Sequence, residues 1–216
     1  MAAIDEIYRY LNEIAPFSTA MDFDNAGFLV GDGKTDVTKA LVTLDITAQS
    51  VRQAREKGAQ LIVSHHPVIF HPLKRLLSNS VPYLLAKEGI GAICAHTNLD
   101  MAPGGVNDCL AAALRLSGRI GVAFYGELPC CVMGTLAQPM EPKSFAAFVK
   151  ERLSCEGIRY VAGNRPVRKV ALCSGAGGEF LFDAMEKGAD AFVTGEVKHH
   201  EILAAKEAGL TLVDGG

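Results

Sequence analysis

The sequence lacks features that mark several large classes of protein. Its 21 lysines and arginines do not outnumber its 24 aspartates and glutamates, and the formal net charge is -3. A dedicated nucleic-acid binder needs a basic excess to neutralise phosphates, so we expect no nucleic-acid partner. No stretch approaches the roughly 18 uncharged apolar residues that a membrane-spanning helix needs. We therefore also expect no membrane partner.

The sequence also carries no sign of export. Its first residues, Met1 to Glu6, contain neither the basic region nor the apolar region of a signal peptide. None of its six cysteines forms a C-x-x-C pair, and most lie within apolar runs. We expect them to be reduced core residues, which excludes a disulfide framework and a zinc knuckle. The expected compartment is the cytoplasm.

What is present is an apolar chain with alternating strands and helices. It has 216 residues, of which 49% are hydrophobic, enough for one or two domains with a sizeable core. The alternation predicts βαβ units on mostly parallel sheets, an α/β fold. The expected strands are 40–46, 61–63, 90–95, 169–173, 191–193 and 210–213. The expected helices are 3–14, 48–58, 81–87, 107–116, 144–153, 178–187 and 197–208.

The two halves of the sequence resemble each other at a fixed offset of 130 residues. The matching segments are Lys39–Val42 with Lys169–Leu172, Glu56–Ala59 with Glu186–Ala189, and Ile62–Ser64 with Phe192–Thr194. The phrase Glu-Lys-Gly-Ala is common at helix ends, so coincidence is the alternative. We predict two similar α/β lobes, 1–120 and 121–216, with a boundary in the glycine-punctuated stretch Gly118–Gly126. Their strand ends would meet at a common cleft, where ligands bind in open α/β sheets.

The strongest chemical signal is a pair of histidines after the strand 61–63. His65 and His66 are followed by Pro67, which restricts His66 to an extended backbone. Adjacent side chains on an extended backbone diverge, so the pair suits two metals, or a metal and a substrate, better than one ion. A solvated or capping histidine pair is the alternative.

A second histidine follows the strand 90–95. His96 precedes Asp100 by four residues, and that carboxylate can return to the same strand end. Imidazole together with carboxylate suits Zn, Mn, Fe or Ni. Alone, the segment would be a turn, but two strand ends with histidine in one lobe favour a metal site.

Four further segments carry weaker signals. Gly104–Asp108 opens a helix and suits either an anion or a plain cap by Asn107. Ser174–Gly178 is a glycine-rich loop that suits either a phosphate or a tight turn. Glu196 and His200 lie one helical turn apart, and His199–His200 resembles a second ligand pair. The acidic turn around Asp24 either closes on itself or lines the site.

Taken in order, six of these segments resemble the dinuclear-metal-centre hexameric protein family. This family is also called NIF-three-like and includes the GTP cyclohydrolase I type-two homologues. The resemblance runs from Pro16 to Gly216. The matching segments are Asp24–Phe28, Ser64–Phe70, Ala95–Asp100, Gly104–Asp108, Ser174–Gly178 and Thr194–His200. A phenylalanine, Phe23, stands where the family commonly has tryptophan.

The resemblance implies two α/β lobes, a toroidal homohexamer built as a trimer of dimers, and two divalent metal ions between the lobes. It implies His65, His66 and Asp100 as metal ligands, with His96 in the site region. The family's other ligands lie in a G-H-x-x-x-E segment that would begin at Gly216. We therefore expect the sequence to be cut short there, the alternative being a protein that has lost part of its metal site.

Three functions remain open at this point. The first is a metal-dependent hydrolase of a nucleotide or related small molecule, with His96, Glu196 and His200 as candidate catalytic groups for proton transfer. The second is a DHH-like phosphoesterase, although Ser64 stands where that motif needs aspartate. The third is a non-enzymatic metal-binding ring with a chaperone or regulatory role.

Overall fold

Three short parallel strands make up most of the sheet in the first part of the chain. The computed structural model describes all 216 residues and divides them into two compact units, Met1–Pro103 and Gly104–Gly216. In the first unit the strand order is β2-β6-β5-β4, with β2 antiparallel to β6. Its elements are β1 (Ala2–Ala3), α1 (Ile4–Ile14), η1 (Phe17–Thr19), β2 (Gly27–Val30), β3 (Asp36–Val37), β4 (Ala40–Thr43), α2 (Ala48–Lys57), β5 (Leu61–Ser64), α3 (Val81–Glu88), β6 (Gly91–Cys94) and α4 (Thr97–Met101).

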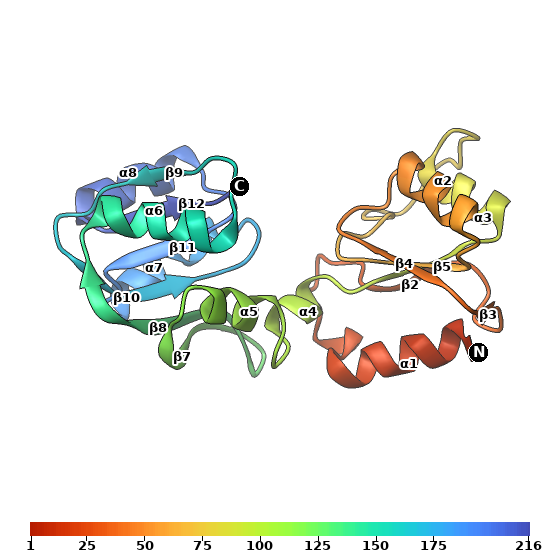
Figure 1. The fold of residues 1–216 in the computed structure, drawn as a ribbon, viewed down its shortest axis with the longest axis horizontal. Coiled ribbons are helices and arrows are strands. Elements are labelled where there is room, and N and C mark those ends of the chain that lie inside the picture. The colour runs from red at the N-terminus through yellow and green to blue at the C-terminus, as the bar shows by residue number, and fades with distance from the viewer. The chain divides into compact units, whose positions relative to one another are not determined.

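Helices cover both faces of this sheet. Figure 1 shows α2 and α3 above the strands and α1 below them. Successive side chains of a strand point to opposite faces. Ile62 accordingly packs in the cluster with Val51 and Leu85 from α2 and α3, whereas Leu61 packs in the cluster with Ile4 from α1. The first unit is therefore a three-layer α/β sandwich.

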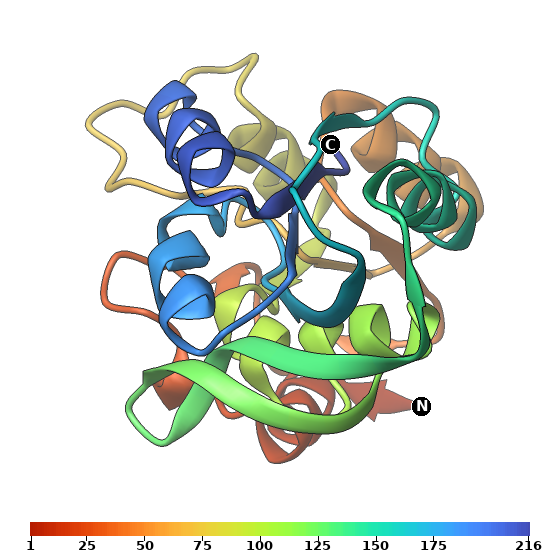
Figure 2. The same cartoon turned by 90° about the vertical axis from the view of Figure 1, so that its left-hand side faces the viewer.

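The second unit has a six-stranded mixed sheet in the order β7-β8-β10-β11-β12-β9. Strands β10, β11 and β12 are parallel, and the other three are antiparallel to their neighbours. Figure 2 shows β7 and β8 as a long two-stranded ribbon at the lower edge. The elements are α5 (Val106–Ala113), β7 (Ser117–Tyr125), β8 (Leu128–Met140), α6 (Pro142–Leu153), β9 (Arg159–Val161), β10 (Val167–Leu172), η2 (Gly178–Phe180), α7 (Leu181–Glu186), β11 (Ala191–Thr194), α8 (His199–Ala208) and β12 (Thr211–Asp214).

The core of the second unit also lies on both faces of its sheet. One cluster joins Phe145 of α6 and Leu114 to β8 and β10, and the other joins Leu181 of α7 and Ala205 of α8 to Phe192 of β11. This unit is therefore a second three-layer α/β sandwich.

Strand pairing in the two units agrees with the predicted internal repeat. Ala40 pairs with Leu61 and Leu61 with Gly91 in the first unit; Val170 pairs with Ala191 and Ala191 with Thr211 in the second. These positions differ by 130, 130 and 120 residues, the offsets seen in the sequence. Each unit also adds an antiparallel strand beyond the third parallel strand, β2 or β9. The prediction of two similar α/β lobes is confirmed.

Local capping explains where the crossover helices begin and end. Thr47 caps α2, where its Oγ1 accepts a hydrogen bond from the Ser50 amide at 3.2 Å. Helices α2 and α8 both end at a glycine in the left-handed conformation, Gly58 with φ 64° and Gly209 with φ 66°. Glycine adopts this conformation without the steric cost of a side chain. None of the helices combines the length and apolar character that crossing a bilayer requires.

Several predicted boundaries differ from the structure. The units divide after Pro103, whereas the boundary predicted from the sequence lies at residue 120. The stretch Gly118–Gly126 instead belongs largely to β7, whose pairing with β8 accommodates the glycines. The strand expected over 40–46 ends at Thr43, and the helix expected over 178–187 begins as a 3-10 turn. Strands β2, β7, β8 and β9 were not predicted. Each of them pairs antiparallel with a neighbour and lies outside the alternation of strand and helix from which the fold was predicted.

The buried side chain of Phe192 is expected to carry much of the stability of the second unit. Phe192 is 0% exposed at the centre of the sheet. Replacing it, Phe192→Ala, should lower the free energy of unfolding by about 3–5 kcal/mol because it leaves a cavity. Phe192→Leu should lower the free energy of unfolding by a smaller amount, because leucine fills part of the cavity. The free energy of unfolding is measured by urea denaturation, with circular dichroism as the probe.

The matched control is Phe182→Ala, since Phe182 in α7 of the same unit is 48% exposed. Its effect should stay within roughly 0.5 kcal/mol. Equal losses for Phe192→Ala and Phe182→Ala would contradict the described core.

Candidate functional site

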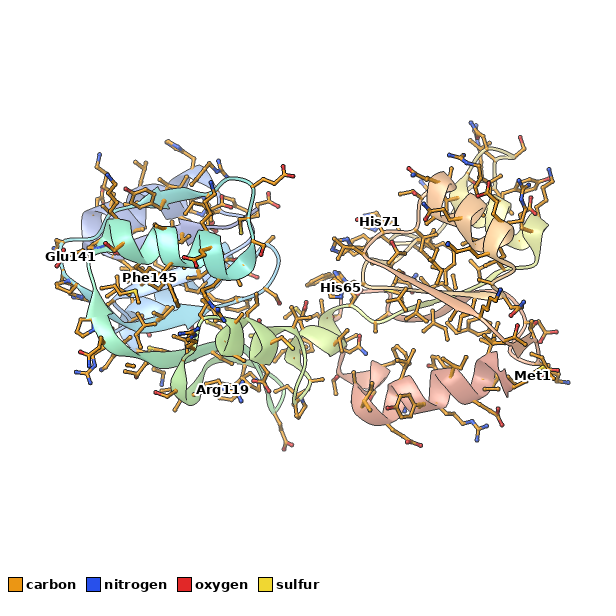
Figure 3. All side chains as sticks on the ribbon, in the orientation of Figure 1. Met1, His65, His71, Arg119, Glu141 and Phe145 are labelled. Carbon is orange, nitrogen blue, oxygen red and sulfur yellow. The ribbon has the colours of Figure 1, made fainter.

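Three histidine rings converge where β5 and β6 end. One ring nitrogen from each of His65, His66 and His96 lies within 4.8 Å of those of the other two. The ring centroids are 5.1 Å apart for His65 and His66, 5.1 Å for His65 and His96, and 5.6 Å for His66 and His96. Figure 3 labels His65 at this end of the first unit. The structure thus brings together three of the residues singled out in the sequence.

The backbone after β5 explains why neighbouring histidines converge. The strand ends at Ser64 and the chain bends at His65 and His66. The Ser64 hydroxyl donates to the His66 carbonyl at 2.8 Å, and the Cys94 thiol donates to the His65 carbonyl at 3.0 Å. The expectation that the two side chains diverge on an extended backbone is therefore wrong. The strand ends at Ser64, so His65 and His66 lie in the bend that follows it.

Each of the three imidazoles is held through its Nδ1 atom by an oxygen. His65 Nδ1 lies 2.9 Å from the carbonyl oxygen of Ala95. His66 Nδ1 lies 2.8 Å from Asp45 Oδ1, and His96 Nδ1 lies 2.8 Å from Asp24 Oδ1. A carbonyl or carboxylate only accepts hydrogen bonds, so in each neutral ring Nδ1 carries the proton and Nε2 keeps its lone pair.

Asp24 is the most buried of these supports. Its side chain is 0% exposed, and it accepts hydrogen bonds from His96 Nδ1, from the Thr97 amide at 3.1 Å, from the Thr97 hydroxyl at 2.6 Å and from the Asn25 amide at 2.6 Å. Burial opposes ionisation, but the hydrogen bonds from His96 and Thr97 outweigh it and lower the pKa of Asp24 to about 2. Asp24 is therefore a fixed negative charge behind His96.

Protonation of the rings follows from their surroundings. Burial lowers the pKa of His65, although the nearby Asp100 carboxylate partly offsets this effect. The hydrogen bond to Asp24 raises the pKa of His96 against the effect of burial. Burial raises the pKa of the neighbouring Cys94 thiol to about 12. That thiol is protonated at neutral pH, as its hydrogen bond to the His65 carbonyl requires.

This donor set fits a divalent transition metal. It supplies three imidazole nitrogens, and the Asp100 carboxylate lies 3.6 Å from His65 Nε2. Metal-binding histidines characteristically hold their second ring nitrogen against a carboxylate or carbonyl oxygen, and all three rings here meet that condition. Nitrogen and carboxylate ligands suit Zn, Mn, Fe or Ni.

Asp45 was not predicted from the sequence as a site residue, and two interpretations were left open for the turn around Asp24. Asp45 lay inside the strand expected over 40–46, whereas β4 ends at Thr43 and frees it to reach His66. One signal in the sequence could have identified it: Asp45 closely follows β4, and β4 pairs with β5, the strand that precedes His65 and His66. Asp24 belongs to a distant turn, and only the fold places it against His96.

The remaining predicted site residues lie in the second unit. Glu196 is exposed after β11, and His200 is exposed in the first turn of α8, with Nε2 3.8 Å from Glu201 Oε1. The helix begins at His199, so Glu196 precedes it and does not share a helical face with His200.

The two glycine-containing segments are tied down by internal hydrogen bonds. Asn107 is buried inside the first turn of α5, whose cap is Gly105. Asn107 Nδ2 donates to the Cys130 carbonyl at 3.1 Å and its Oδ1 accepts from the Ser174 amide at 2.9 Å. The Gly177 amide donates to Thr194 Oγ1 at 3.0 Å. These bonds favour the tight-turn interpretation of Ser174–Gly178 and exclude Asn107 as the cap.

The Asp24 carboxylate is expected to control how well His96 binds a metal. Asp24→Asn keeps the shape of the side chain but removes its charge, so it should lower metal affinity by about 10–100-fold. The control Asp36→Asn changes an exposed carboxylate of β3 and should leave affinity unchanged. Titration with Mn or Zn in a calorimeter measures both, and equal affinities for Asp24→Asn and the unmodified chain would show that the contact does not matter.

Comparisons with known proteins agree with this fold. The family described as Duf34/NIF3 (NGG1p interacting factor 3) matches residues 2–216. A Clostridium perfringens protein named GTP cyclohydrolase 1 type 2 homolog is 31% identical over 221 residues, which cover 99% of this chain and 84% of that protein. A crystal structure of a Staphylococcus aureus hypothetical protein is 32% identical with a TM-score of 0.90, covering 98% of this chain and 85% of that one. A Bacillus cereus protein related to NIF3 is 25% identical with a TM-score of 0.93, covering 99% and 88%. The chain therefore belongs to the DUF34/NIF3 family.

Proposed function

We propose that this protein is a metal-dependent hydrolase that binds two divalent ions and acts on a nucleotide or a related small molecule. The observation that carries the proposal is the anchoring of His65, His66 and His96, each through Nδ1 to an oxygen. Such anchoring fixes the rings and leaves their Nε2 atoms available as ligands.

The ligands in this proposal come from the ends of neighbouring strands. We assign His65, His66 and Asp100, as the family resemblance implies. We add His96, because its ring belongs to the same cluster. Asp24 and Asp45 orient His96 and His66 from behind and keep Nδ1 protonated. The number and identity of the ions, the homohexameric assembly and the location of the site between the lobes stay predictions.

Bound divalent ions would lower the pKa of a coordinated water and stabilise charge that develops on a substrate oxygen. The chain itself supplies the groups that move protons. Glu196 and His200 remain our candidates for this role, since carboxylates and imidazoles are side chains that commonly act as general acids and bases. The relatives named GTP cyclohydrolase 1 type 2 homolog support a nucleotide as the substrate.

The DHH-like phosphoesterase has no specific support. Ser64 occupies the position where that motif needs aspartate, and its hydroxyl donates to the His66 carbonyl at 2.8 Å. Ser64 thereby shapes the bend that carries the histidines.

Removing a histidine of the cluster should remove metal. We expect the unmodified chain to retain Mn or Zn after dialysis. His66→Ala and His96→Ala should lose most of it, because each removes a ligand nitrogen. His71→Ala is the matched control, since His71 is exposed and lies outside the cluster. Elemental analysis gives the number of ions per chain.

The same samples test the enzymatic part of the proposal. The metal-loaded chain is incubated with GTP, a nucleotide panel and bis-p-nitrophenyl phosphate, and the products are separated by chromatography. We expect turnover to be lost in His66→Ala and retained in Asp36→Asn, because Asp36 is an exposed residue of β3 away from the cluster. If metal binds but every substrate remains intact, the hydrolase proposal fails and a non-enzymatic metal-binding role takes its place.

Glu196→Gln and His200→Asn should lower kcat by about 10²–10⁴-fold, because each removes a group that exchanges protons. Metal content should not change in either variant. Glu207→Gln is the control, as Glu207 is an exposed carboxylate elsewhere on α8. Unchanged kcat in both Glu196→Gln and His200→Asn would remove these residues from the mechanism.

A further inference from the structure

Two phenylalanines are exposed beside the residues that support the histidine cluster. Phe23 is 62% exposed and directly precedes Asp24, whereas Phe70 is 40% exposed and follows the histidine pair by four residues. Their ring centroids lie 6.4 Å apart with the planes tilted by 46°, so the two rings are not stacked face to face. A single exposed aromatic ring is common on protein surfaces. A pair of exposed rings beside the histidine cluster is more informative, because exposed apolar patches often mark binding sites.

The Phe23–Phe70 pair is fixed to the histidine site from both sides. The Asn25 side-chain amide donates to the Ile69 carbonyl at 2.6 Å, which ties the turn of Phe23 to the segment of Phe70. The next residue in that turn, Asp24, holds His96. The His71 and Phe70 rings make an edge contact, with a centroid distance of 4.8 Å and an angle of 76° between their planes. The pair is therefore held by the same turn that brings Asp24 to the cluster.

The segment that carries Phe70 is also cationic. No aspartate or glutamate occurs from His65 to Lys87, and Lys74 and Arg75 are both exposed. The arginines that form ion pairs with carboxylates are other residues: Arg55, Arg119, Arg159 and Arg165. Positive charge thus follows the aromatic pair along one exposed segment, and Figure 3 shows His65 and His71 at the same end of this unit.

We propose that Phe23 and Phe70 form the subsite that receives the planar ring of a nucleotide, and that Lys74 and Arg75 meet its phosphates. This inference rests on the proposed function and assigns the substrate-binding side of the same site. Every nucleobase presents a flat π-face that stacks on aromatic side chains, and phosphates pair with lysine and arginine. An aromatic pair followed by two unpaired cations is complementary to a ligand with one ring and one anionic end.

The test is equilibrium binding to the 216-residue chain by calorimetry, with GTP, guanosine and inorganic triphosphate as probes. GTP should bind more tightly than triphosphate. The double variant Phe23→Ala/Phe70→Ala should weaken GTP binding about tenfold or more, since stacking on two rings is lost. Lys74→Gln/Arg75→Gln should weaken GTP binding and leave guanosine binding unchanged.

Two further variants serve as controls for the role of the aromatic rings. Phe23→Leu/Phe70→Leu retains apolar surface but removes the rings, so it should lose GTP affinity like the alanine variant. Phe182→Ala removes an exposed ring in the second unit and should change nothing. Equal GTP affinity in the unmodified chain and either double phenylalanine variant would overturn the subsite. Tighter binding of a single-stranded oligonucleotide than of GTP would also overturn it, in favour of a nucleic-acid surface.

This outcome is separable from that of the proposed function. Metal content should be unchanged in Phe23→Ala/Phe70→Ala, because neither ring is a ligand. Phenylalanine-dependent GTP binding without any turnover would sustain the subsite while the hydrolase proposal fails. If bis-p-nitrophenyl phosphate is turned over but GTP affinity does not depend on Phe23 and Phe70, the hydrolase proposal stands and the subsite fails.

Discussion

The parallel register of β4, β5 and β6 is the constraint on which the histidine cluster depends. Thr43 pairs with Ser64, and Ser64 with Cys94, so the three strands end level at one edge of the sheet. Asp45, the His65–His66 pair and His96 each follow within two residues of those ends. Backbone bonds continue the register past the strands, from the Ala95 amide to the Ser64 carbonyl at 2.9 Å and from the His66 amide to the Leu44 carbonyl at 3.0 Å. A shift of one residue in this pairing would separate the rings.

A buried carboxylate completes this arrangement from outside the parallel strands. Asp24 precedes β2, the strand that pairs antiparallel with β6, and β2 therefore delivers it to the end of β6 where His96 lies. A buried charge is costly unless it is fully hydrogen-bonded, and Asp24 meets that condition through His96, Thr97 and Asn25. The same turn positions Phe23, so the support of the cluster and the proposed ring subsite share one structural element.

The scaffold is duplicated in the second unit but the histidines are not. The register of β11 and β12 places Gly195 and Glu196 where the first unit has His65 and His66, and Gly216 where it has His96. The offset of 130 residues made this equivalence visible in the sequence, because the matched phrases fall on strands and on a glycine-stopped helix. The antiparallel strands escaped prediction because their pairing partners, such as β8 for β7, are set by tertiary contacts and not by an apolar run.

The sequence by itself determined the α/β class, the repeat, the family resemblance and the histidines at two strand ends. These follow from local patterns: apolar runs, helix-stopping glycines and motifs of consecutive residues. Only the tertiary structure decided that His65 and His66 converge with His96, and that Asp24, Asp45 and the Ala95 carbonyl hold their Nδ1 atoms. The physical reason is that a hydrogen bond between residues 72 positions apart, as for Asp24 and His96, leaves no periodicity in the sequence and arises only when the strands pair.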